Sequence, residues 1–130
     1  MSLITSERVN DIYHSIGQNI VDVLPEDFVT AWAYAEINDE FYSLELFYRK
    51  PNGRIGYIDD GLGGLERGFR DMLREAPDDN KWTSATFKLS SKGAMSIDFC
   101  YDDVTDFEQA AERRNAWIAQ YLEDRSAIDW

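Results

Sequence analysis

The sequence has 130 residues, of which 13 are Lys or Arg and 25 are Asp or Glu, so its formal net charge is −12. This length suits one core and is too short for two ordinary domains, so we expect residues 1–130 to form a single domain. The charge repels nucleic-acid phosphates and anionic membrane surfaces and favours a basic partner. Because 44% of the residues are hydrophobic, an acidic disordered tail is also excluded.

Residues 5–25 are predicted to form an amphipathic helix, which Thr5 or Ser6 can cap and Pro25 ends. Apolar side chains recur at helical spacing, at Val9, Ile12, Tyr13, Ile16, Ile20, Val23 and Leu24. The sequence contains neither a secretory signal nor a run of about 18 apolar residues that could span a membrane. With its single cysteine, which cannot form an internal disulfide, this favours a soluble cytoplasmic protein.

The next three elements are predicted strands. Residues 28–37 alternate between two faces, one with Ala31, Ala33 and Ala35 and the other with Trp32, Tyr34 and Glu36. Residues 41–48 alternate in the same way after a turn at 38–40. The sequence Pro51-Asn52-Gly53 predicts a tight reversal into a short strand at 54–58, because Asn-Gly tolerates a positive φ.

The second half of the sequence predicts a helix from Leu65 to Pro77 and strands at 84–89 and 95–101. Thr105 and Glu108 have the spacing of a capping box at the start of a last helix, which runs to Leu122. The order α-βββ-α-ββ-α predicts an α+β fold, an antiparallel sheet of about five strands with three helices. We expect the first and last helices to supply the core residues Ile12, Ile16, Ile20, Trp117, Ile118 and Leu122.

Residue types that carry catalysis are few. The one histidine, His14, lies on the first predicted helix without the partners of a catalytic triad, and no adjacent cation activates Cys100. A small hydrolase remains an alternative, because Glu36, Glu45 and Asp98 can all point to one side of the sheet. With 25 acidic residues, however, such groupings arise by chance. We therefore expect no catalytic residue and no cofactor.

An acidic cluster follows the last predicted strand and suggests a hard cation; its members are Asp98, Asp102, Asp103 and Asp106. The spacing does not fit a calcium loop, because Val104 stands where an oxygen ligand is needed and Phe107 where a glycine is needed. Acids near the amino end of a helix favour its dipole, so we assign Asp103 and Asp106 to the last helix and expect no metal site.

The face of strand 28–37 that carries Trp32, Tyr34 and Glu36, with Glu45 beside it, has the composition of a binding surface. Aromatic side chains supply contact area, and carboxylates attract a basic partner. This interpretation requires that the alanine face packs against the helices and the other face stays open. The alternative is that a helix covers this second face and makes Trp32 and Tyr34 core residues.

Several stretches between Trp32 and Leu122 stand in a characteristic order and spacing. They are residues 32–37 running into 41–48, then Trp82-Thr83-Ser84, then Ile97-Asp98-Phe99-Cys100-Tyr101-Asp102-Asp103, then residues 112–117 and 121–122. In these stretches the chain resembles the YezG-like immunity protein family. It departs from the family pattern at Cys100, where an Asp-Phe-Asp-Tyr run has a second acid.

The resemblance implies a cytoplasmic antitoxin that binds the toxin domain of a polymorphic bacterial toxin, typically a nuclease, and protects the producing cell. With the charge of −12 it predicts a basic partner, occlusion of the toxin's active site, no direct contact with nucleic acid or membrane, and a monomer. The predicted partner-binding residues are Trp32, Tyr34, Glu36, Glu45, Asp98, Asp102 and Asp103. An accessory binding subunit without a toxin partner is a third hypothesis.

Overall fold

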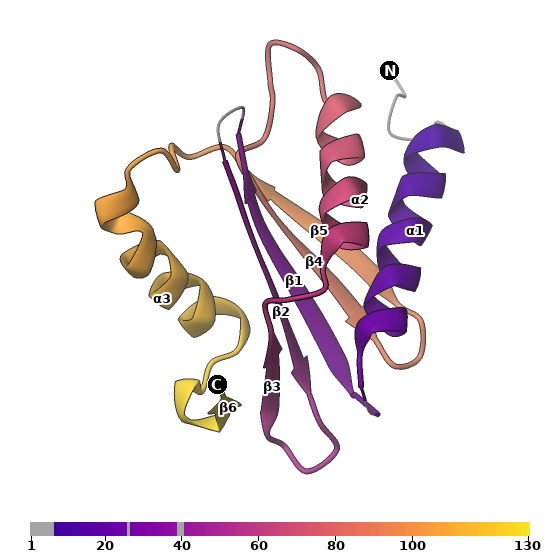
Figure 1. The fold of residues 1–130 in the computed structure, drawn as a ribbon, viewed down its shortest axis with the longest axis vertical. Helices are drawn as coiled ribbons and strands as arrows, with labels where there is room; N and C mark the ends of the chain where they lie inside the picture. Colours follow the sequence, from indigo (N-terminus) through magenta and orange to yellow (C-terminus); the bar gives the residue numbers. More distant parts are fainter. Residues whose placement is uncertain (1–6, 26, 39–40) are drawn as a thin grey trace.

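A computed structural model describes residues 7–25, 27–38 and 41–130 of the chain (Figure 1). A sheet forms the central layer. Helices α1 (Glu7–Val23) and α2 (Gly63–Arg74) lie on one face of it, and α3 (Ala110–Tyr121) lies on the other. This arrangement confirms the predicted α+β class.

The described residues form a six-stranded sheet in the order β5-β4-β1-β2-β3-β6. The strands are β1 (Thr30–Ile37), β2 (Tyr42–Arg49), β3 (Ile55–Ile58), β4 (Ser84–Ser90), β5 (Met95–Cys100) and β6 (Ile128–Asp129). Neighbouring strands are antiparallel except β6, which pairs parallel with β3. The five predicted strands are confirmed, and the sheet is mixed because of the sixth. A two-residue strand shows no alternation, and its partner is distant in sequence, so no local pattern predicts it.

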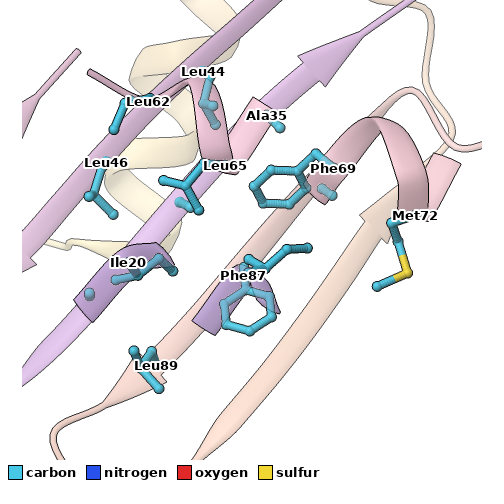
Figure 2. Close-up of a cluster of buried hydrophobic side chains, with 14 of the residues drawn as sticks. Ile20, Ala35, Leu44, Leu46, Leu62, Leu65, Phe69, Met72, Phe87 and Leu89 are labelled. Atoms are coloured by element: carbon cyan, nitrogen blue, oxygen red, sulfur yellow. The ribbon is translucent and has the colours of Figure 1, made fainter. Parts of the chain in front are cut away.

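The larger core lies between the sheet and the layer of α1 and α2. Figure 2 shows side chains of both helices, among them Ile20, Leu65 and Phe69, gathered over Ala35 and Phe87 of the sheet. The three alanines on this face of β1 are fully buried, and their small side chains let the helices approach the sheet closely. The predicted core residues of the first helix, Ile12, Ile16 and Ile20, are all buried here.

A second core lies between the opposite face and the C-terminal part of the chain. Trp117, Ile118 and Leu122, predicted as core residues of the last helix, pack there against Trp32 and Phe47. After α3, Glu123 has a positive φ of 65° and the one-turn helix η3 (Arg125–Ala127) leads into β6. The chain end therefore closes over the same face that α3 covers.

Of the two predicted turns and two predicted helix caps, one of each lies within the described residues. Gly53 has a φ of +86°, and its amide donates to the Lys50 carbonyl at 2.9 Å, which confirms the turn between β2 and β3. The first helix cap and most of the turn at 38–40 involve Thr5, Ser6, Asp39 and Glu40, which lie outside the described residues.

The predicted capping box of the last helix is wrong. The hydroxyl of Thr105 donates to Asp103 instead of accepting from Glu108, and Asp106 Oδ1 accepts the amide of Glu108 at 2.9 Å. A 3-10 turn, η2 (Phe107–Gln109), therefore precedes α3. Asp106 thus caps η2, because its carboxylate is a stronger acceptor than a hydroxyl, whereas the N-cap of α3 is Gln109, which makes no side-chain cap bond.

Candidate functional site

The sheet register aligns the predicted acidic residues on one face. Glu45 of β2 pairs with Tyr34 of β1, Tyr34 pairs with Thr86 of β4, and Thr86 pairs with Asp98 of β5. Paired residues point to the same side of a sheet, and residues two apart along a strand do too, so Glu36 shares this face. The prediction that Glu36, Glu45 and Asp98 lie on one side is confirmed.

This face is covered by α3, so the interpretation of an open binding surface is wrong. Trp32 is only 5% exposed and Glu36 only 6%, while Tyr34 and Glu45 are half-buried. The alternative, in which a helix covers the face, is confirmed. The physical reason is that both faces of β1 carry apolar side chains, and α3 offers a matching stripe that includes Trp117 and Ile118.

The buried carboxylates hold α3 on the sheet. The guanidinium of Arg113 binds Glu36 at two points, with Nε 3.1 Å from Oε2 and Nη2 3.2 Å from Oε1. The neighbouring Arg114 forms an ion pair with Glu45. Burying a carboxylate in this way requires a charged partner, and the two arginines supply one for each.

Two tyrosines complete these ion pairs. The hydroxyl of Tyr34 donates to Glu36 Oε2 at 2.5 Å, and that of Tyr57 donates to Glu45 Oε2 at 2.6 Å. Burial raises the pKa of both phenols well above the ordinary value, and the hydrogen bonds to the carboxylates raise them further. The ring of Tyr34 also stacks on Trp117, with centroids 4.9 Å apart. These phenols are therefore neutral donors within the α3 interface.

A groove of about 580 Å³ lies between α3 and the end of the sheet formed by β4 and β5. We call it the β5–α3 groove. Its lining residues are Tyr34, Ser84, Thr86, Asp98, Phe99, Cys100, Asp102, Val104, Arg113, Ala116, Trp117, Gln120 and Tyr121. Two hydrogen bonds cross it: the indole of Trp117 donates to Thr86 at 2.8 Å, and the hydroxyl of Tyr121 donates to Asp98 at 2.9 Å.

The rim of the groove is acidic. Asp98, Asp102 and Asp103 are all exposed, on β5 or on the segment that leaves it. Asp103 Oδ1 accepts from both the hydroxyl and the amide of Thr105, at 2.7 and 2.8 Å, and these bonds hold its pKa below the usual range. The Cys100 thiol donates to Asp102 at 3.4 Å, so an acceptor rather than a cation lies beside the sulfur. Three exposed carboxylates therefore lie at this end of the groove, with Asp98 and Asp102 on its lining.

The arrangement does not favour the hydrolase alternative. Acid hydrolysis of a glycosidic bond needs two carboxylates that face each other across the substrate. Here Glu36 and Glu45 are each bound by an arginine of α3, and Asp98 is bound by Tyr121. Within the described ranges, no three side chains of His, Cys, Asp or Glu are grouped so as to hold a metal ion. His14 is exposed on α1, across the sheet from the groove.

Sequence reasoning missed the residues of α3 that complete the site, Arg113, Arg114 and Tyr121. A signal was available in the sequence: two adjacent arginines precede an apolar stripe on the last predicted helix, while the carboxylates of Glu36, Glu45 and Asp98 fall on one face of the predicted sheet. Opposite charges on two amphipathic elements are an indication that the elements pack together. The ion pairs of Arg113 and Arg114 with the glutamates were not predicted, because the paired residues are far apart in the sequence.

Comparison with known proteins identifies the class of protein to which this chain belongs. The family model described as "Immunity protein YezG-like" matches residues 59–126, just over half of the chain. The chain belongs to the YezG-like immunity protein family. Membership supports an immunity, or antitoxin, role and implies a toxin as partner.

Two curated relatives extend the likeness over most of the chain, and both are called "Immunity protein YezG". The protein from Bacillus spizizenii (strain ATCC 23059 / NRRL B-14472 / W23) is 26% identical, over 88% of this chain and 83% of its own length. The protein from Bacillus subtilis (strain 168) is 27% identical, over 84% of each chain. Separately, none of the helices that the structure describes is both long and apolar enough to cross a membrane.

Proposed function

We propose that this chain neutralises the toxic domain of a cognate polymorphic bacterial toxin by binding it tightly and occluding its active site. The toxic domain is a basic nuclease, and the chain acts in the cytoplasm as a monomeric, non-enzymatic inhibitor. The observation that carries this proposal is the β5–α3 groove with its acidic rim, in a family whose members are immunity proteins. Two further observations support it, one electrostatic and one on the location of the groove in the chain.

The first support is electrostatic. A nuclease domain binds a polyanion and is therefore commonly basic around its active site. A protein of charge −12 with exposed carboxylates at the mouth of a groove is attracted to the same surface. Such an inhibitor competes directly with the nucleic-acid substrate, and long-range attraction speeds its encounter with the toxin.

The second support is the location of the groove within the chain. Every residue of its lining except Tyr34 falls within residues 59–126, the segment that matches the family model. Residues 59–126 supply both walls, since β4 and β5 form one side and α3 the other. The part of the chain that defines the family therefore also builds the proposed contact surface.

The predicted partner-binding residues divide into two groups under this proposal. Asp98, Asp102 and Asp103 contact the toxin from the rim, and Tyr34 lies on the groove wall. The other three residues do not contact the toxin and instead hold α3 in position. Glu36 and Glu45 fix α3 through its arginines, and Trp32 packs beneath the helix.

The proposal is tested by co-purification with the C-terminal domain of the toxin encoded beside this gene. We expect a one-to-one complex, loss of nuclease activity in that complex, and survival of cells that produce both proteins. Binding without loss of nuclease activity would refute occlusion of the active site. Absence of both binding and protection would refute the toxin partner itself.

A further inference from the structure

One edge of the sheet is left without a neighbouring strand. Among the strands that the structure describes, β5 pairs only with β4, along Met95 to Cys100. The opposite edge is closed by β6, a strand of two residues whose Asp129 binds Arg54 and Lys50. Short strands and charged side chains are common devices that prevent pairing at an edge. The two edges of this sheet are thus built differently.

The free hydrogen-bonding groups of β5 can be identified from the pairing. At the hairpin, the Ser90 amide donates to the Ala94 carbonyl at 2.8 Å, so these two residues form a hydrogen-bonded pair. In an antiparallel ladder such pairs alternate, so the main-chain groups of Ser96, Asp98 and Cys100 point toward β4. Those of Met95, Ile97 and Phe99 point away from the sheet, where no described strand receives them. β5 thus offers a row of free donors and acceptors.

The β5 edge also lacks the features that usually protect an edge. Its sequence, from Met95 to Cys100, contains no lysine, no proline and no glycine. Its six residues pair with β4 in unbroken register, so no bulge twists the edge away. The single charge, Asp98, is already bound by Tyr121 across the groove. An edge of this kind is a template for an added strand.

The side chains along β5 differ between its two faces. Phe99 is 38% exposed and stacks on the buried Trp82, and Tyr101, just beyond the strand, is 53% exposed. On the other face, Asp98 and Cys100 line the β5–α3 groove, and Asp102 follows them. A strand laid along β5 would therefore meet aromatic surface with alternate side chains and acidic groove with the rest.

We infer that β5 receives an extended segment of the toxin domain as an additional strand of the sheet. This inference rests on the proposed function and specifies how the partner is held. The segment carries basic side chains at alternate positions, facing Asp98 and Asp102, and apolar side chains between them, facing Phe99. Main-chain hydrogen bonds supply affinity in this mode of recognition, and the alternating side chains supply specificity.

The decisive experiment compares Phe99→Pro with Phe99→Ala. Both variants lose the stack on Trp82, but only proline removes an outward amide and blocks an added strand. The ladder with β4 uses the other amides and stays intact, which urea unfolding of the free variants verifies. With the toxin domain encoded by the adjacent gene as probe, we expect Kd for Phe99→Pro to exceed that for Phe99→Ala about tenfold or more. Ile97→Pro against Ile97→Ala repeats the comparison at the next outward amide.

Hydrogen exchange gives a second readout on the unsubstituted chain. The amides of Ile97 and Phe99 should become protected in the complex, and those of Ser96 and Asp98 should be protected already in the free chain. Equal Kd values for the proline and alanine variants, with unchanged exchange, would overturn the inference while leaving the proposed function standing. A free chain that dimerises, and is made monomeric by Phe99→Pro, would overturn it in favour of a second copy at this edge. Failure of the unsubstituted chain to bind would instead refute the proposed function.

Discussion

The guanidinium of Arg113 on α3 donates two hydrogen bonds to the carboxylate of Glu36 on β1, with N···O distances of 3.1 and 3.2 Å. The Tyr34 hydroxyl donates to the same carboxylate at 2.5 Å. Glu36 is buried, and its guanidinium partner is itself mostly covered. A carboxylate in this position is tolerated only while its partner is present. The first prediction follows from this dependence.

Arg113→Met should lower the free energy of unfolding by about 3 kcal/mol, because it leaves the Glu36 charge buried and unpaired. Adding Glu36→Gln should recover part of that loss, since the neutral amide needs no cation. Urea unfolding of the two single variants and the double variant measures the coupling. The control is Arg74→Met, which breaks an exposed pair with Asp71 and should change stability by about 0.5 kcal/mol or less. Equal losses in Arg113→Met and Arg74→Met would contradict the prediction.

Stability should decline in alkaline solution because of Tyr34. Burial and the carboxylate of Glu36 raise the pKa of Tyr34 above the value of about 10 that it has when unfolded. The folded protein then keeps a proton that the unfolded chain releases, so this contribution is complete below about pH 10 and is lost as the pH rises further. The free energy of unfolding, measured from about pH 9 to pH 11, should fall less steeply for Tyr34→Phe than for the unsubstituted chain. Parallel curves would rule out this role for the phenol.

The contact between α1 and α2 depends on a glycine. A Cβ placed on Gly68 would lie 2.7 Å from Cγ1 of Ile16, a fully buried side chain that has no room to move. Gly68→Ala should therefore destabilise the protein by about 1 to 3 kcal/mol, although alanine is favoured over glycine in a helix by about 1 kcal/mol. Gly63→Ala is the matched control, because its Cβ would meet only Arg67 Nη1 at 3.8 Å. Thermal unfolding of the two variants decides between clash and helix propensity.

Association with the toxin domain should be steered by the groove rim. Asp98→Asn with Asp102→Asn preserves the size of both side chains, and the asparagine at 98 can still accept from Tyr121. Stopped-flow mixing should show association slowed about threefold or more, with a weaker dependence on salt. Asp11→Asn with Asp22→Asn removes the same charge from α1, on the other side of the sheet, and should have a smaller effect. Equal slowing by both pairs would mean that net charge alone steers the encounter.

Local pattern was sufficient for most of the fold. The periodicity of Ile12, Ile16 and Ile20 identified the buried face of α1. Alternation identified four strands, and the turn at 51–53 identified the short β3. The strand β6, which begins at Ile128, was not predicted, because it is two residues long and pairs with β3, which lies much earlier in the sequence. Long-range pairings of this kind depend on the tertiary structure and leave no trace in a short window.

The functional surface was harder to predict than the fold. The alternation of β1 and β2 predicts that Glu36 and Glu45 face outward, because the opposite, alanine-bearing face is the one expected to pack against the helices. Their partners, Arg113 and Arg114, lie on a helix that comes much later in the sequence. The local sequence around each glutamate therefore does not predict that its charge is neutralised by an ion pair. Asp98, unlike Glu36 and Glu45, is exposed as predicted. It lies on the edge strand β5, which is separated from α3 by the β5–α3 groove.

Cys100, at the mouth of the groove, gives the protein a native attachment point for a probe. It is the single cysteine of the sequence, and its side chain is exposed one residue before Tyr101, at the end of β5. A thiol-reactive fluorophore would therefore label one position, next to the rim carboxylates, without any substitution. The same geometry means that a disulfide between two chains would join their β5 ends and obstruct both edges. Samples for binding studies therefore need a reductant, and binding lost on oxidation and restored by reduction would locate the contact near this strand.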